Sequence, residues 1–412
     1  MRFIFRKIGI SLVIRDLIIL SLVYLFIFNP PFKFMPFGIP KILYLFALTY
    51  LIIKSKLGSF LLSYKSILKP MLIYISYSLI IQFITFSNAS FAQINFFILF
   101  ESFITTYVIA EILVHLYNNK ADKMVMWTII IASLISVVMI SNPSLNSYVR
   151  DTLLIEQKEN IEHVLAFRAF GFAEDLLYTF AIVLGIGTCL CLKYAKNNKC
   201  YYIFIIPLLI GILFNARIGI VPIILYLFYL VIIERNFSLI IYITVFIVTL
   251  VTILLNSSFG EEYEVTINWI MDGINEISNI FTGEQSEKNT NTDTLIRMIV
   301  FPESIGGIIF GTGENIYLKW NNNSDIGYIL QIYFGGIIYL FLFLLIVIKL
   351  FVKLLANNLC DKWFNYIFIG TILLCNIKGY FFYTCSGMRV LMLLFYIYIL
   401  LRQKKIAAYF NN

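Results

Sequence analysis

Apolar runs of roughly 17 to 25 residues recur along almost the whole of this chain, and they constrain its fold more than any other feature. A helix of about 20 apolar residues crosses the hydrocarbon core of a bilayer, where backbone hydrogen bonds must be satisfied internally. The composition agrees, because 60% of the 412 residues are hydrophobic and only 13% are charged. The sequence therefore predicts an all-α, polytopic integral membrane helical bundle that forms one domain over residues 1–412.

The apolar runs predict about twelve transmembrane helices. Their expected ranges are 8–28, 38–53, 67–86, 94–116, 124–141, 172–193, 201–215, 217–233, 237–255, 326–352, 364–383 and 386–402. The first range follows basic residues but lacks a small-residue cleavage site, so we expect it to be retained as an anchor. The ranges that flank Arg217 contain Pro207 and Pro222 and are expected to form a tight hairpin.

The distribution of charge predicts the orientation. Most of the 31 basic residues fall in alternate connecting segments, whereas most of the 23 acidic residues fall in the others. Basic segments face the cytoplasm, so both termini are expected to be cytoplasmic. The net charge of +8 is thus explained by orientation, and no nucleic-acid partner is expected.

Two segments on the outer side, residues 142–171 and 256–325, are longer than simple turns. The second is predicted to contain an amphipathic helix, because apolar residues recur there with helical spacing. These residues are Tyr263, Ile267, Ile270, Ile274, Ile277 and Phe281. External chemistry is expected at these two loops.

Arg168 and Arg217 are the first candidates for a substrate-binding site. Arg168 ends the shorter outer loop and Arg217 lies at the tip of the expected hairpin, so both could face one cleft at the outer membrane edge. A guanidinium binds phosphate well through paired hydrogen bonds. The alternative is that both side chains only anchor helix ends at the interface.

Candidate general bases cluster around Arg168. Glu174 and Asp175 lie at the mouth of an expected span, where a carboxylate is costly unless it is paired. His163 lies further back in the loop, where an ordinary solvated side chain explains it as well. Within the spans, Glu101 is a functional candidate because ionisable residues are rare in membranes.

Three further groups are weaker candidates for substrate binding. Gly311 and Gly313 would allow a close backbone approach to a ligand, and Asp325 follows them at the start of a span, but ordinary loop geometry explains the glycines equally well. Lys378 and Arg389 flank an aromatic run at the outer end of the last helix pair, where an aromatic belt is the alternative.

Several familiar motifs are absent from the sequence. It contains no phosphate-binding loop, no H-E-x-x-H, no C-x-x-C and no Asp-x-Asp. These absences argue against an ATPase, a zinc hydrolase and a metal-dependent sugar-nucleotide transferase. No cofactor and no metal site are expected.

Three segments resemble the Wzy family of bacterial polysaccharide polymerases and, more distantly, O-antigen ligases. They run from Arg168 to Asp175, from Asn215 to Gly219, and from Gly311 through Asp325 to Gly336. The sequence departs from the Arg-x10-Gly pattern of some members, because Gly307 comes one residue too early after Arg297.

The resemblance implies a metal-independent membrane glycosyltransferase. It would transfer a growing glycan from undecaprenyl pyrophosphate to the sugar of another lipid-linked repeat unit, on the outer face of the bacterial cytoplasmic (inner) membrane. Arg168 and Arg217 would neutralise the departing pyrophosphate. The product would be O-antigen lipopolysaccharide or capsule, and a chain-length regulator and a flippase would be partners.

Two alternatives stay open at this stage. A lipid-linked oligosaccharide flippase or other transporter also suits about twelve spans with cytoplasmic termini, although the long outer loop is unusual for that class. An O-antigen ligase is the other alternative, but the longer outer loop contains no histidine.

Overall fold

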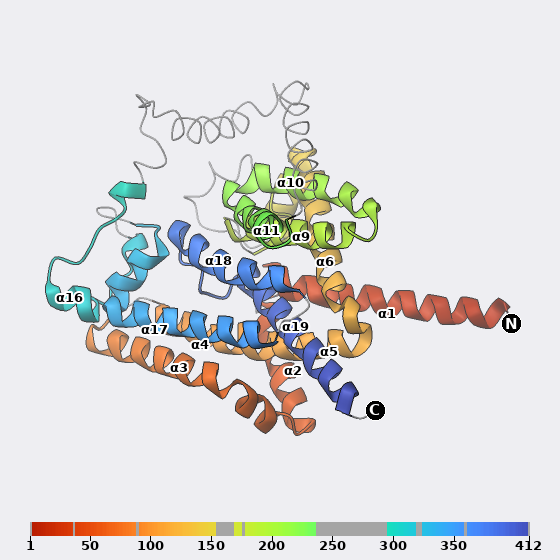
Figure 1. Cartoon of the computed structure of the whole chain (residues 1–412). Coiled ribbons are helices and arrows are strands. Elements are labelled where there is room, and N and C mark those ends of the chain that lie inside the picture. Colours follow the sequence, from red (N-terminus) through yellow and green to blue (C-terminus); the bar gives the residue numbers. More distant parts are fainter. Residues whose placement is uncertain are drawn as a thin grey trace.

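The computed structural model describes residues 2–35, 38–87, 90–153, 169–174, 178–235, 295–318, 324–357 and 361–410. Within these ranges the elements are all helices, packed side by side and across one another as a bundle (Figure 1). The predicted all-α class is confirmed for this part of the chain.

The first three helices are α1 (Arg2–Phe28), α2 (Ile39–Ile53) and α3 (Leu57–Ile84). Pro40 lies in the first turn of α2, where its missing N–H has no partner to lose. Helix α3 begins well before the expected span 67–86. Lys65, which precedes the expected span, and Lys69 therefore both belong to this helix, where they are exposed.

The next expected span, 94–116, is one continuous helical run with a change of pitch. It comprises α4 (Phe91–Phe97), a π-helical segment (Ile98–Thr105) and α5 (Thr106–Tyr117). Asn118 then adopts a positive φ of 48° and turns the chain into α6 (Ala121–Ile140). The break between these two expected spans thus follows the predicted boundary.

Beyond α6 the described chain continues with α7 (Pro143–Tyr148), α9 (Tyr178–Ala195), α10 (Ile205–Asn215) and α11 (Ile220–Ile232). Both α10 and α11 pack against α9 (Figure 1). At about 1.5 Å per residue, α10 is about 16 Å long and α11 about 20 Å, less than the ~30 Å hydrocarbon core. These expected spans are therefore shorter apolar helices, bounded by 3-10 turns.

The C-terminal part contains α16 (Ile305–Phe310), α17 (Gly327–Asn357), α18 (Lys362–Lys378) and α19 (Ser386–Phe410). No residue of α19 from Met388 to Ile399 is more than 3% exposed. A helix that is buried on all sides belongs in the core of a bundle. The last helix of the chain thus lies at its centre, where it packs against α5, α9 and α1.

An ionic group built around the buried carboxylate of Asp122 joins four of these helices. The Lys193 ammonium of α9 lies 2.6 Å from both Asp122 of α6 and Asp361, the residue that precedes α18. The hydroxyls of Tyr194 and Tyr398 donate to Asp122 at 2.6 and 3.1 Å. Because a buried charge is costly without partners, this group favours one arrangement of α6, α9, α18 and α19.

Several helices are long and apolar enough to cross a membrane. They are Leu57–Ile84, the run Phe91–Ile140, Tyr178–Ala195, Gly327–Asn357 and Ser386–Ile406, with shorter apolar helices at Ile39–Ile53, Lys199–Asn215 and Arg217–Ile232. Large apolar side chains on the surface, such as Leu62 at 75% and Phe86 at 88% exposure, suit contact with lipid. The expected span 237–255 and the amphipathic helix expected at 263–281 lie outside the described residues.

The orientation is open to a labelling test. Single cysteines replace Ser286, in the expected outer loop, or Lys404, near the end of α19, in a cysteine-free background. We expect an impermeant thiol reagent to label Ser286→Cys in intact cells, and Lys404→Cys only after permeabilisation, because basic segments face the cytoplasm. The reverse pattern would place the candidate site on the wrong side of the membrane.

Candidate active site

Arg389, in the first turn of α19, occupies the centre of the candidate site. Arg389 is only 1% exposed. The guanidinium donates to the backbone oxygens of Ile27 at 3.1 Å and Thr384 at 3.2 Å, and to the carboxylates of Glu101 at 3.3 Å and Glu174 at 3.4 Å. It therefore joins α1, the π-helical segment, the loop before α9 and the start of α19 at one point.

Glu101 is the buried carboxylate of this site. It lies in the π-helical segment Ile98–Thr105 and is 3% exposed. Such segments are rare and occur often at functional sites, because the extra residue per turn redirects a side chain. An ionisable residue at this depth is costly without a partner, and the Arg389 guanidinium supplies one.

Glu174 is the accessible carboxylate. Its side chain is 37% exposed, compared with 4% for that of Glu101. Its backbone N–H donates to the Phe28 carbonyl at 2.8 Å, and the Asn29 side-chain amide donates to its Oε2. The backbone and the carboxylate are thus both held against the end of α1.

Asn29 contacts both Glu174 and the start of α2. It follows α1 with a positive φ of 42°, a conformation that asparagine tolerates better than most residues. While its amide nitrogen donates to Glu174, its Oδ1 accepts from the Ile39 N–H at 2.9 Å. One side chain therefore links the end of α1, the start of α2 and the exposed carboxylate.

We call Asn29, Glu101, Glu174 and Arg389 the Arg389 cluster. Two carboxylates share one guanidinium in it, so the cluster is negative overall when both are ionised. The more exposed member, Glu174, contacts Asn29 and Arg389, and 37% of its side-chain surface is accessible. Such a carboxylate can accept a hydrogen bond from an incoming hydroxyl and take its proton.

Residues 169–174 connect the Arg389 cluster with the hairpin that carries Arg217. The segment ends at Glu174, a member of the cluster. It begins at Ala169, whose carbonyl accepts from the Asn215 side chain at 3.1 Å and from the Ser136 hydroxyl. The chain just after Arg168 thus contacts the end of α10 just before Arg217.

Arg217 is half-buried in a 3-10 turn, Arg217–Gly219, between α10 and α11. The turn packs closely against α9: a Cβ on Gly219 would lie 2.4 Å from the Ala181 carbonyl, and one on Gly185 would lie 2.1 Å from the Gly219 carbonyl. These two glycines therefore allow the backbone contact that fixes the position of Arg217.

Gly311 and Gly313 lie at positions where the backbone conformation and the close packing both require glycine. Both have positive φ, of 87° and 74°, and a Cβ on Gly311 would lie 2.3 Å from the Phe334 carbonyl. The Thr312 and Gly313 N–H groups donate to the carbonyls of Tyr333 and Phe334 at 2.7 and 2.9 Å, beside the break in α17 at Gly336. Substrate binding by these two glycines stays a prediction, and so does binding by the partly exposed Asp325.

Lys378 and Arg389, the two candidate substrate-binding cations that flank the aromatic run, differ in burial. Lys378 is exposed at the end of α18, whereas Arg389 is inside the bundle. Phe381 and Phe382 between them are 0% exposed, so the interpretation as an aromatic belt is wrong for these two. The reason is that α18 ends at Lys378, and the following residues turn inward to pack in the core.

Three predicted site residues, His163, Arg168 and Asp175, lie outside the described residues. Sequence reasoning missed Asn29 as a member of the site, because a single asparagine after a span carries no distinctive pattern. It also did not foresee that Glu101 and Arg389 would meet, although each was singled out. Across the described ranges, no group of three or more histidine, cysteine, aspartate or glutamate residues has a metal-binding arrangement.

Comparisons with family models, with curated proteins and with solved structures found no match to this chain. A helical bundle by itself does not indicate an activity, because one fold supports many. The features of this chain that bear on function are therefore the Arg389 cluster and the contact between Ala169 and Asn215.

Proposed function

We propose that this protein is a membrane glycosyltransferase that polymerises lipid-linked oligosaccharide repeat units at the outer face of a bacterial cytoplasmic membrane. The observation that carries the proposal is the Arg389 cluster, which holds one accessible carboxylate, Glu174, in a fixed orientation within a helical bundle. The resemblance of the segments around Glu174, Arg217 and Gly311 to Wzy polymerases supplies the reaction class.

The donor in this proposal is a glycan on undecaprenyl pyrophosphate, and the acceptor is a sugar hydroxyl of a second lipid-linked unit. Glu174 takes the proton of the acceptor hydroxyl as the new glycosidic bond forms and the bond to the pyrophosphate breaks. The negative Arg389 cluster suits a hydroxyl donor and disfavours phosphate. The pyrophosphate is then assigned to Arg217 and Arg168, the two cations for which the resemblance implies this role.

An apolar groove suits the lipid part of such a substrate. Between the end of α3 and the start of α4 lies a hollow of about 780 Å³. It is lined by Ile75, Leu79, Gln82, Phe83, Phe86, Ser87, Ala92, Gln93, Phe96 and Phe97. Phe83 and Phe86 are 79% and 88% exposed, so a polyprenyl chain could lie against them without displacing core residues.

Polymerisation by the purified protein is the direct test. The protein is reconstituted with synthetic undecaprenyl-pyrophosphate repeat units, and we expect a ladder of products that differ by one repeat. A transporter would instead move a fluorescent lipid-linked sugar across vesicles and leave its length unchanged. Transport without any ladder would overturn the proposal in favour of a flippase.

Arg217 supplies a second test of the same proposal. Two phosphates leave with the lipid, and the loss of one preorganised charge donor typically slows such a step about 10²- to 10³-fold. We therefore expect Arg217→Ala to produce almost no ladder. Arg217→Lys should be intermediate, because lysine keeps the charge but loses the paired hydrogen bonds.

Lys199→Ala is the matched control for Arg217. It removes an exposed cation from the 3-10 turn before α10, at the opposite end of that helix from Arg217. Wild-type turnover by Arg217→Ala, in protein that remains folded, would eliminate a role in the reaction and leave only interfacial anchoring.

A further inference from the structure

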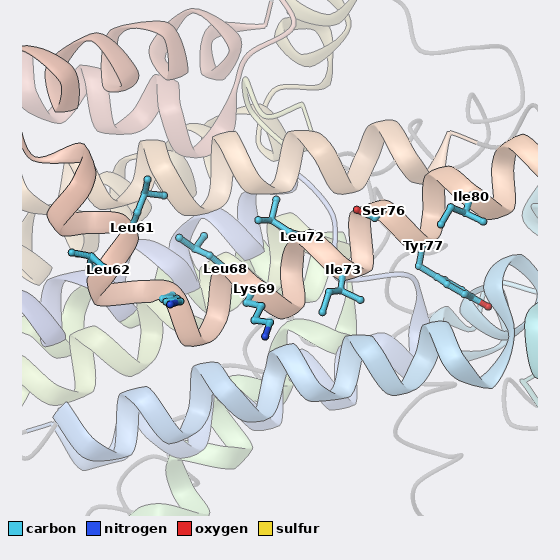
Figure 2. Close-up of a pocket in the computed structure, with 10 residues that line it drawn as sticks. Leu61, Leu62, Leu68, Lys69, Leu72, Ile73, Ser76, Tyr77 and Ile80 are labelled. Atoms are coloured by element: carbon cyan, nitrogen blue, oxygen red, sulfur yellow. The ribbon is translucent and has the colours of Figure 1, made fainter.

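A groove of about 650 Å³ runs along one face of α3 (Figure 2). All its lining residues come from this helix: Leu61, Leu62, Lys65, Leu68, Lys69, Leu72, Ile73, Ser76, Tyr77 and Ile80. Lys65 and Lys69 lie one turn apart toward one end, and apolar side chains line most of the rest. The groove is therefore cationic near one end and apolar beyond it.

Helix α17 lies beside α3 in the opposite direction. The Tyr77 hydroxyl donates to the Gly335 carbonyl at 3.0 Å, and the Lys353 ammonium donates to the Ser63 carbonyl at 2.9 Å. Lys353 and the exposed Lys349 thus lie toward the same end of the helix pair as Lys65. In Figure 2 the Lys69 side chain points toward α17.

The end of the α3–α17 pair that carries the four lysines is positively charged. Neither α3 nor α17 contains an aspartate or a glutamate. The four lysines therefore have no carboxylate within their own helices, and Lys65 and Lys69 are both exposed. An anion is the complementary ligand.

The length of the apolar part indicates what kind of anion fits. From Lys69 to Ile80 the helix rises about 17 Å, at about 1.5 Å per residue. Half of the ~30 Å hydrocarbon core, the depth of one leaflet, is about 15 Å. A headgroup bound at Lys65 and Lys69 would thus place its acyl chain along Leu72, Ile73 and Ile80.

We propose that this groove binds one anionic diacyl phospholipid, with its phosphate at Lys65 and Lys69 and an acyl chain along α3. The site is separate from the Arg389 cluster and does not depend on the proposed polymerase activity. Its ligand belongs to the leaflet at the Lys65 end, which the charge distribution predicts to be cytoplasmic.

Native mass spectrometry of the full chain, released from detergent with added lipid, tests the proposal. We expect wild-type protein to retain one phosphatidylglycerol in preference to phosphatidylcholine with the same acyl chains. Each lysine near an anionic lipid contributes about fivefold, so Lys65→Gln/Lys69→Gln should retain phosphatidylglycerol about 30-fold less tightly. The matched control, Lys54→Gln/Lys199→Gln, removes two exposed lysines outside the groove and should bind as the wild type does.

A second pair of variants tests the apolar part. Ile73 and Ile80 are 47% and 54% exposed in the groove, so Ile73→Trp and Ile80→Trp fill it without entering the core. Either variant should lose the bound lipid while all four lysines remain, and either one suffices if the other fails to fold. Glycerol phosphate, which lacks acyl chains, should not compete.

Four outcomes would overturn the proposal. Equal retention of phosphatidylcholine would mean an unselective lipid surface, and unchanged binding by Lys65→Gln/Lys69→Gln would remove the headgroup site. Competition by glycerol phosphate would mean an anion site without a role for the groove. A dimer mass that Ile73→Trp abolishes would mean that a second copy of the chain covers this face.

Discussion

Glu174→Gln should reduce polymer formation by about 10²- to 10⁴-fold, the usual contribution of a general base. The amide keeps the size of the carboxylate and an oxygen that can accept from Asn29, but it cannot take a proton from the acceptor sugar. The Arg389 guanidinium keeps Glu101 as its partner, so the fold should persist. The measurement is the initial rate of ladder formation with synthetic lipid-linked repeats, alongside the thermal midpoint of each variant.

Two further substitutions sharpen the test of Glu174. Glu174→Asp keeps the charge but withdraws the carboxylate by one methylene, so an intermediate rate is expected. Glu303→Gln removes an exposed carboxylate on the same predicted side and should leave the rate unchanged. Asp175→Asn and His163→Ala complete the set: full ladders from both Glu174→Gln and Asp175→Asn, together with a loss in His163→Ala, would reassign the base to His163.

Much of the fold could be predicted from apolar length alone. Expected ranges such as 38–53, 124–141 and 386–402 lie close to α2, α6 and α19, because runs of this length favour helices in a bilayer. Hydropathy says less about how polar or broken segments pack. The early start of α3, the 3-10 turns beside α10 and the inward turn after Lys378 depend on neighbouring helices and were not predicted.

The site could also be predicted only in part, because its contacts depend on which helices pack together. Glu174 was singled out because a carboxylate at a span mouth needs a partner. The identity of that partner could not be derived, because Arg389 follows Glu174 only after several further helices. Arg389 was expected at the outer end of the last helix pair, and its burial could not be derived, because it depends on the packing of α19 at the centre of the bundle.

Arg389→Met should be the most destabilising single substitution in the site. It leaves the carboxylates of Glu101 and Glu174 without their shared cation, and breaking a buried ion pair typically costs about 3–5 kcal/mol. Glu101 is affected most, because its side chain is only 4% exposed. Equilibrium unfolding by SDS in mixed micelles, followed by tryptophan fluorescence, measures the change in the free energy of unfolding.

The exposed pair of Arg150 and Asp151 is the matched control. Their side chains are 35% and 62% exposed and 3.5 Å apart, so Arg150→Met should cost less than about 1 kcal/mol. A loss for Arg389→Met as small as that for Arg150→Met would mean that the guanidinium does not hold the cluster together.

The double substitution Arg389→Met/Glu101→Gln separates charge from packing. It removes the buried carboxylate together with its cation, so only the more exposed Glu174 stays charged, and solvent can reach it. If unpaired charge causes the instability, the double variant should be more stable than Arg389→Met alone, and the two substitutions should be strongly non-additive. If packing or the bonds to the Ile27 and Thr384 carbonyls dominate instead, the double variant should be no more stable than the single one. This double-mutant cycle thus decides whether Glu101 balances the charge of Arg389, the residue that also contacts the more exposed carboxylate of Glu174.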